Sequence, residues 1–196
     1  MAGRKLLTNS ILLHHCCVVC SPKVLEYFQK NLPSVVGFWF NPNIYPEDEF
    51  ARRQNALESY ARLLNYRIIY GPEYPLTRWL TEVEKYGTAE PERCRFCYEL
   101  RLRMTAEAAK ENGFKYFSTT LLSSPYQKHE LVKEIAESVA RTSGREFVYY
   151  DFRSQFYTGR NEIAKLGLYR QKYCGCQFSY KDRLKREKNK TGGKQI

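Results

Sequence analysis

Seven cysteines fall into three short motifs whose spacing suits metal or redox chemistry. The motifs are HHCCVVC at 14–20, RCRFC at 93–97 and CGC at 174–176. Free cysteine is often a small buried hydrophobe, which would account for one cysteine better than for three beside two imidazoles. Two C-x-x-C pairs are typical of metal-binding thiols, so the pattern favours a metal site over packed or redox thiols.

The spacing between the motifs indicates that the ligands come from distant loops. A compact zinc ribbon keeps its two pairs close in sequence, whereas Cys20 and Cys94 are far apart. The second motif opens a predicted helix, where the helix dipole and Arg93 and Arg95 are expected to favour thiolate over thiol. Gly175 is expected to bend the third motif so that both of its sulfurs face one point.

The number of thiols exceeds the needs of one four-ligand site. An iron-sulfur cluster takes four thiolates, so the remainder can hold a second, single metal ion. Side chains alternate along extended chain, so Cys16 and Cys17 are expected to point apart and to serve different centres.

Polar and aromatic residues near the motifs are further candidates. His14 and His15 are candidate ligands or proton donors, although a histidine near a strand end is more often a hydrogen-bonded structural group. Asp151, beside Arg153, can deliver a proton or form an ion pair. The remaining candidates are Asn41 and Asn43, which orient the site or cap a turn, and Tyr45, Tyr98 and Tyr126, which can stack on a base.

The elements that position these residues alternate between apolar and amphipathic stretches. Strands are predicted over 11–15, 35–40, 67–70, 116–120 and 147–151, and helices over 23–30, 47–65, 76–86, 95–112, 128–141 and 159–171. This order predicts a doubly wound α/β fold, with a mostly parallel sheet and helices on both faces. Such sheets bind ligands beyond the carboxyl ends of their strands, where the first motif lies. No glycine-rich phosphate loop stands there, since the chain has no glycine between Gly3 and Gly37.

Length and charge bound the class of protein. At 196 residues the chain suits one α/β metallo-domain over 1–180 that folds without a metal. A net charge of +11 indicates a polyanionic partner such as nucleic acid, with solubility alone as the alternative. The segment 181–196 is basic and is expected to be a flexible tail. Cysteine-rich metal motifs without a membrane-length apolar run favour the cytoplasm.

The motifs LLHHCCVVC, FNPNIYP, RCRFCYELRL and YCGCQFS resemble those of the cobalamin-independent epoxyqueuosine reductases of the QueH family. The resemblance covers 12–179 and implies reduction of epoxyqueuosine in tRNA to queuosine. It also implies a 4Fe-4S cluster beside one additional metal ion, iron or zinc, and an electron donor that the sequence does not identify. The implied fold resembles that of the adenine-nucleotide alpha-hydrolases without the phosphate loop.

Within that resemblance we expect the thiols to divide between two centres, with His14 as a further metal ligand. A structural-zinc protein that binds RNA and an ATP-dependent tRNA thiolation enzyme remain alternatives, although the latter needs the missing phosphate loop. The expected division is Cys17, Cys94 and Cys97 on the cluster, Cys16, Cys174 and Cys176 in a catalytic role at the single ion, with Asp151 beside them, and Cys20 as a further metal ligand.

Overall fold

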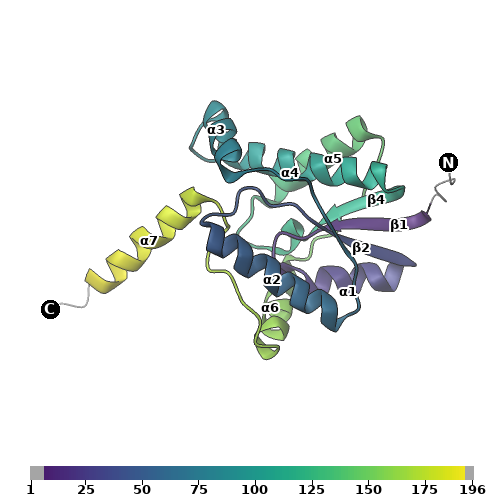
Figure 1. The fold of residues 1–196 in the computed structure, drawn as a ribbon, viewed down its shortest axis with the longest axis horizontal. Helices are drawn as coiled ribbons and strands as arrows, with labels where there is room; N and C mark the ends of the chain where they lie inside the picture. The colour runs from purple at the N-terminus through teal and green to yellow at the C-terminus, as the bar shows by residue number, and fades with distance from the viewer. Residues whose placement is uncertain (1–6, 193–196) are drawn as a thin grey trace.

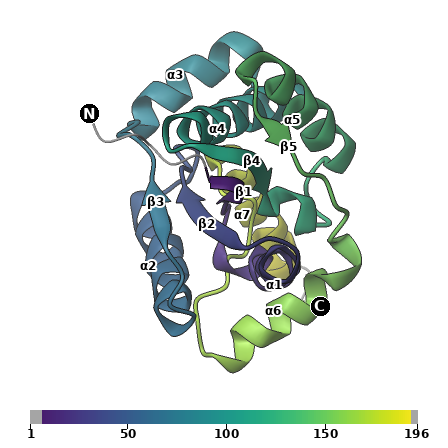
Figure 2. The same cartoon turned by 90° about the vertical axis from the view of Figure 1, so that its right-hand side faces the viewer.

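The computed structural model describes residues 7–192, which form a five-stranded sheet with parallel pairings throughout. The strands lie in the order β3-β2-β1-β4-β5, as in a doubly wound sheet. Figure 1 shows β2, β1 and β4 side by side, and Figure 2 shows all five strands. The predicted fold class is therefore confirmed. The strands are β1 Leu7–His14, β2 Ser34–Trp39, β3 Ile68–Tyr70, β4 Phe114–Thr119 and β5 Glu146–Phe147.

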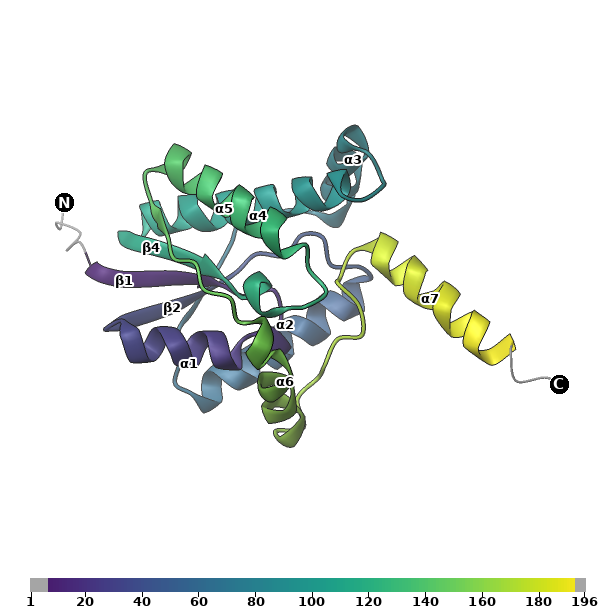
Figure 3. The ribbon, with the colours of Figure 1, turned by 180° about the vertical axis from the view of Figure 1, so that it is seen from behind.

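Helices cover both faces of the sheet, with α1 and α2 on one face and α4 and α5 on the other (Figures 2 and 3). Within residues 7–192, no helix combines the length and the apolarity that a membrane span requires. The helices are α1 Pro22–Asn31, α2 Glu47–Leu63, α3 Leu76–Tyr86, α4 Glu92–Glu111, α5 His129–Ser143, α6 Phe156–Lys165 and α7 Gln177–Gly192, with short 3-10 turns η1 Val18–Cys20, η2 Thr120–Ser123 and η3 Arg153–Gln155.

The central strand β1 is buried on both faces. Ile11, Leu12 and Leu13 have no exposed surface, and Ile11 pairs with Val35 on one side and with Tyr116 on the other. A strand covered on both faces needs apolar residues at consecutive positions, which explains the ILL run. Because parallel strands end at one edge, the loops after β1, β2 and β4 all leave from the carboxyl edge of the sheet.

Two predicted elements end well before their predicted last residues. The helix predicted over 159–171 begins earlier and ends at Lys165, because Gly167 has a φ of +68° and terminates it. The strand predicted over 147–151 pairs only through Glu146 and Phe147. The chain beyond α6 is therefore free of helix until α7, and the CGC motif lies in this segment.

The basic segment expected to be a flexible tail is helical over much of its length. α7 begins just after Cys176 and extends away from the sheet on the side of its carboxyl edge (Figures 1 and 3). No apolar period of 3.6 runs through this helix, so the sequence offered no signal for it. Residues 193–196 of the predicted tail lie outside the described residues.

Candidate metal centre

One buried side chain connects all three cysteine motifs. The guanidinium of Arg101, on α4, interacts electrostatically with the thiols of Cys16, Cys97 and Cys174, one from each motif. Its Nη1 lies 3.8 Å from Cys97 Sγ. The motifs that are separate in sequence therefore meet at the carboxyl edge of the sheet, as the sequence predicted.

The thiols of the first motif form a compact triad. The Sγ atoms of Cys16, Cys17 and Cys20 all lie within 4.8 Å of one another, and those of Cys16 and Cys17 are 3.7 Å apart. The expectation that the two adjacent cysteines point apart was wrong, because the chain leaves β1 at His14 and turns into η1 at Val18 instead of continuing as a strand. Three sulfurs converge here on one point.

The triad is held by hydrogen bonds from η2, the turn that follows β4, and by the electrostatics of its neighbours. Thr120 Oγ1 accepts from the Cys16 backbone N–H at 2.9 Å and donates to Cys16 Sγ at 3.3 Å. Hydrogen bonds from Cys17 and Cys20, and then the charge of Arg101, lower the pKa of Cys16. Hydrogen bonds to Cys16 and Cys17, and then burial, raise the pKa of Cys20, so Cys16 is the thiol of the triad that loses its proton more readily.

Both histidines of the first motif are fully buried and neutral. Burial lowers the pKa of His14 to about 3 and that of His15 to about 4. His14 Nε2 donates to the Phe40 carbonyl at 3.3 Å, and its Nδ1 lies 2.8 Å from the Thr119 hydroxyl. Both nitrogens are thus engaged, so ligation by His14 requires one of these bonds to break. His15 likewise contacts Ser21 and Tyr66 through its two nitrogens.

The other four thiols form a second, wider group, the quartet Cys94, Cys97, Cys174 and Cys176. Each of Cys94 and Cys97 lies close enough to Cys174 for that thiol to raise its pKa, and Cys176 also acts on Cys97. Within residues 7–192, only the triad brings three thiols within 4.8 Å of one another. The quartet sulfurs are therefore grouped but more widely spaced.

Burial, rather than charge, controls the thiols at the start of α4. It raises the pKa of Cys94 and of Cys97 to about 12, so the prediction that this pair favours thiolate was wrong. The flanking arginines are engaged elsewhere, since Arg93 pairs with Glu90 at 2.6 Å and Arg95 with Glu134 at 2.8 Å. A metal that binds here must displace protons from the thiols.

Arg101 has no acidic partner among the described residues, although it is 2% exposed. Its Nη2 donates to Asn41 Oδ1 at 2.7 Å, and Asn41 Nδ2 donates to the His15 carbonyl at 2.9 Å. Asn41 therefore orients the site by joining α4 to the loop after β1. Sequence analysis missed Arg101, although its position one helical turn after Cys97 was a usable signal.

A second buried arginine, also missed, holds the CGC motif against α2. Arg53 donates to the carbonyls of Cys174 at 2.9 Å and Tyr173 at 3.0 Å, and its Nε donates to Glu49 at 2.7 Å. Gly175 has a φ of +137°, and a Cβ there would lie 3.1 Å from Arg53 Nη1. The predicted bend at Gly175 is confirmed, and close packing adds a second reason for glycine.

The remaining candidates are an ion-paired aspartate and three tyrosines that differ in exposure. Arg153 holds Asp151 through three side-chain contacts of 2.6–3.1 Å and lowers its pKa to about 2, so Asp151 is an ion-pair partner. Of the three candidate tyrosines, Tyr98 is buried and Tyr45 packs against Tyr180. Tyr126 is 73% exposed and directly precedes Gln127, whose amide contacts Cys174.

The fold and the site together define a doubly wound α/β protein with a cysteine-rich site at the switch point of its sheet, between β1 and β4. The structure resembles that of the U34-tRNA thiolase NcsA from Methanococcus maripaludis with its 4Fe-4S cluster. The TM-score is 0.55 with 11% identity, over 90% of this chain and 63% of that one. At this identity the likeness concerns the fold.

Sequence comparisons identify the family. The family model described as epoxyqueuosine reductase QueH matches residues 11–182. Relatives of that name are 35% identical in Dehalococcoides mccartyi, over 91% of this chain and 96% of the relative, and 33% identical in Thermotoga maritima, over 92% and 94%. The chain belongs to the epoxyqueuosine reductase QueH family, and is thus an oxidoreductase.

Proposed function

We propose that this protein reduces the epoxide of epoxyqueuosine in tRNA to queuosine, and that its thiols hold a 4Fe-4S cluster and one further metal ion. Family membership supports the reaction, and the three motifs around Arg101 support the cofactors. Conversion of an epoxide to an alkene takes up two electrons and two protons and releases water. An electron donor must therefore supply the protein, and the reaction belongs in the cytoplasm with other tRNA modification.

The observation that carries the proposal is the buried charge of Arg101. A buried cation is costly unless an anion lies beside it, and no carboxylate among residues 7–192 forms an ion pair with this one. The groups beside it that can become anionic are the thiols of Cys16, Cys97 and Cys174. Thiolates that ligate a metal or an iron-sulfur cluster carry the negative charge that this site lacks, so the residues fit such groups.

The spacing of the thiols supports a division between the two centres. A metal–sulfur bond of about 2.3 Å in a tetrahedral site separates its sulfurs by roughly 3.8 Å. The triad, with 3.7 Å between Cys16 and Cys17, matches such a single-ion site, and three ligands leave a fourth position open. The wider quartet supplies the four thiolates that a cluster needs. This division differs from that expected from the sequence, which placed Cys16 with Cys174 and Cys176.

The two groups supply complementary chemistry. When bound, a cluster delivers electrons one at a time and a single metal ion acts as a Lewis acid toward the epoxide oxygen. Arg101 offsets the charge of the thiolates, and Arg53 fixes the backbone of the CGC motif. His14 and His15 stay neutral and add no positive charge to the site. Cys174 is exposed, so the substrate approaches from its side.

The test is anaerobic reconstitution followed by metal and sulfide analysis and by an assay of nucleosides from treated tRNA. We expect about four irons and four acid-labile sulfides per chain, one further metal ion, and conversion of epoxyqueuosine to queuosine with a chemical reductant. Zinc without acid-labile sulfide, in protein that leaves epoxyqueuosine intact, would refute the proposal and favour a structural-zinc protein that binds RNA.

A further inference from the structure

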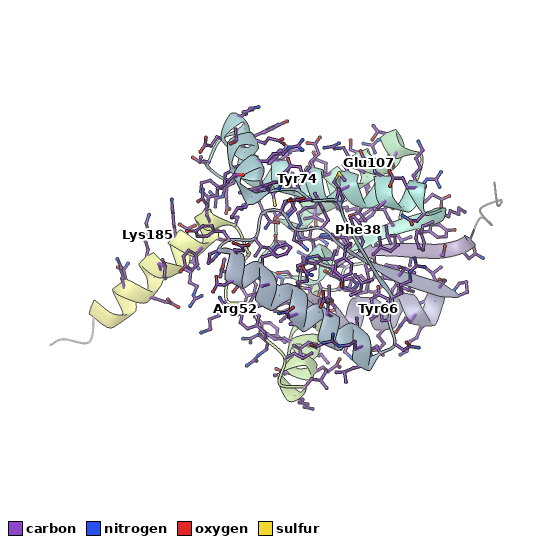
Figure 4. All side chains as sticks on the ribbon, in the orientation of Figure 1. Phe38, Arg52, Tyr66, Tyr74, Glu107 and Lys185 are labelled. Carbon is purple, nitrogen blue, oxygen red and sulfur yellow. The ribbon has the colours of Figure 1, made fainter. Side chains whose placement is uncertain are left out.

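α7 is a basic helix that extends beyond the body of the molecule. Figure 1 shows it leaving the carboxyl edge of the sheet, and Figure 4 shows Lys185 on its outer part, away from the other elements. Its sequence contains six Lys or Arg against two Asp or Glu. Lys185 and Arg186 are exposed and have no acidic partner among the described residues.

Only the first turns of α7 are fixed to the body. Phe178 packs near Trp79 and under Arg93, and Tyr180 packs against Tyr45 and Tyr173. Beyond Arg183, whose guanidinium lies 5.9 Å from the Tyr173 ring, the structure shows no ring contact to the body within the described residues. One end of the helix is therefore anchored beside the CGC motif, and the other is presented to solvent.

The outer part of α7 has the surface of a partner-binding helix. A helix of this length that buries no apolar face is marginal in water, so a bound partner would add most of its stability. After Tyr180, Leu184 is its one large apolar side chain up to Asn189, so α7 lacks the apolar face of a membrane-surface helix. The excess of positive charge fits a polyanion instead.

We propose that α7 binds the phosphate backbone of the tRNA substrate, beside the cysteine site. This inference rests on the proposed function, which makes tRNA the polyanion present. Cys176 directly precedes Gln177, the first residue of α7, so RNA that lies along the helix is led to the exposed Cys174. Phosphate contacts position an RNA without reading its bases. Such positioning is what a surface next to the reacting nucleotide must provide.

The experiment compares two charge reversals of equal size. Lys185→Glu with Arg186→Glu changes the outer part of α7, whereas Lys110→Glu with Arg141→Glu changes exposed residues near the ends of α4 and α5, at the opposite edge of the sheet. Binding of a fluorescent tRNA transcript is measured by anisotropy from 50 to 200 mM KCl. We expect the α7 variant to bind roughly tenfold more weakly at the lowest salt, with its log–log salt slope reduced by about two, while the control changes little.

The outcomes separate this inference from the proposed function. Equal affinities for the two variants, with tight binding by the unaltered protein, would overturn the role of α7 and leave the reductase proposal intact. Loss of iron from the α7 variant would assign α7 to the metal centre and overturn its role in RNA binding. Binding of poly-glutamate as tight as that of tRNA, through Lys185 and Arg186, would assign α7 to an acidic protein instead. No tRNA binding by the unaltered protein would refute the proposed function itself.

Discussion

Arg101 places a positive charge where the described residues offer no carboxylate to balance it. Its contacts run to Cys97 and, through Asn41, to the loop that carries the triad. The charge thus lies between the two groups of thiols. If the thiols stayed neutral, the positive charge of Arg101 would be buried without a negative charge beside it. The site is therefore more stable when its cysteines are thiolates.

Arg101→Met should weaken metal binding while the fold persists. Residues that support metal ligands typically contribute 10- to 100-fold in metal affinity, and we expect a loss of about that size. Iron per chain after anaerobic reconstitution measures it. The control is Arg103→Met on the same helix, where the side chain is half exposed and pairs with Glu107. Equal iron content in the two variants would contradict the role of Arg101.

Asp151→Asn should leave epoxide reduction nearly unchanged. The pKa of Asp151 is lowered to about 2, chiefly by its hydrogen bonds to Arg153, so the group is ionised and holds no proton near neutral pH. A lowered folded pKa stabilises the protein above the unfolded value near 3.9, and this contribution disappears as pH falls toward 2. Unfolding midpoints of the two proteins should therefore differ slightly at pH 7 and converge in acid. A large loss of turnover at pH 6–8 would restore Asp151 as a proton donor.

At the residue scale, the sequence predicted which cysteines gather better than it predicted their environment. Cysteine motifs can be recognised from their spacing, and the bend at Gly175 was predicted from its place between two cysteines. Arg53 and Thr120 gave no such signal, because their contacts to Cys174 and Cys16 join distant parts of the chain. The pKa values of Cys94 and Cys97 also depend on burial, which only the folded structure defines.

Among the elements, α2 has a role beyond covering the sheet. The side chains of Arg53 and Glu49 are both 2% exposed and form a buried ion pair. The guanidinium of Arg53 also donates hydrogen bonds to the carbonyls of Tyr173 and Cys174. The segment between α6 and α7 has no secondary structure from Leu168 to Cys176, so these bonds, together with that from the Tyr45 N–H to the Gly175 carbonyl at 2.8 Å, fix where the CGC motif lies.

Arg53→Met should release that segment and destabilise the protein. Removal of one partner of a buried ion pair typically costs about 3–5 kcal/mol, because the other charge, here Glu49, stays buried. Chemical denaturation measures the loss, and faster amide hydrogen exchange over residues 171–176 locates it. Arg52→Met is the matched control, since Arg52 is half exposed and its pairs contribute about 1 kcal/mol or less. Similar losses in both variants would show that α2 does not hold the motif.

Element types followed from the sequence wherever the apolar period was clear. Helix α3 has the predicted bounds, Leu76–Tyr86, and each predicted strand has a counterpart in the sheet. The failures have physical causes: Gly167 ends α6 early, and α7 has no apolar face to detect. Most of α7 does not pack against the rest of the protein, so its sequence has no periodic apolar pattern from which a helix could be predicted.

For the molecule as a whole, the proposed division of the seven thiols between two centres can be tested directly. Cys94→Ala should abolish the visible absorption of the cluster, because the quartet has no spare thiol. Cys16→Ala should keep most of that absorption, lose the single metal ion and abolish epoxide reduction, because the triad would then offer two ligands. Visible spectra, metal analysis and nucleoside assays check the three readouts. Loss of sulfide and colour in Cys16→Ala, equal to that in Cys94→Ala, would show that the division is wrong.

The quartet draws its thiols from the start of α4 and from the segment before α7, so one centre that holds them ties the two ends of a long stretch of chain together. Such a tether acts as a staple: by analogy with a disulfide around a loop on the order of 100 residues, it would be worth about 4–5 kcal/mol. Without iron, the chain from Gly167 onward would depend on Arg53, on a few further hydrogen bonds such as that from the Tyr45 N–H to the Gly175 carbonyl, and on aromatic contacts. It would then be the first part open to proteases. A cell short of iron would then degrade the protein as well as leave it inactive, which would couple the abundance of the protein to the supply of its metal.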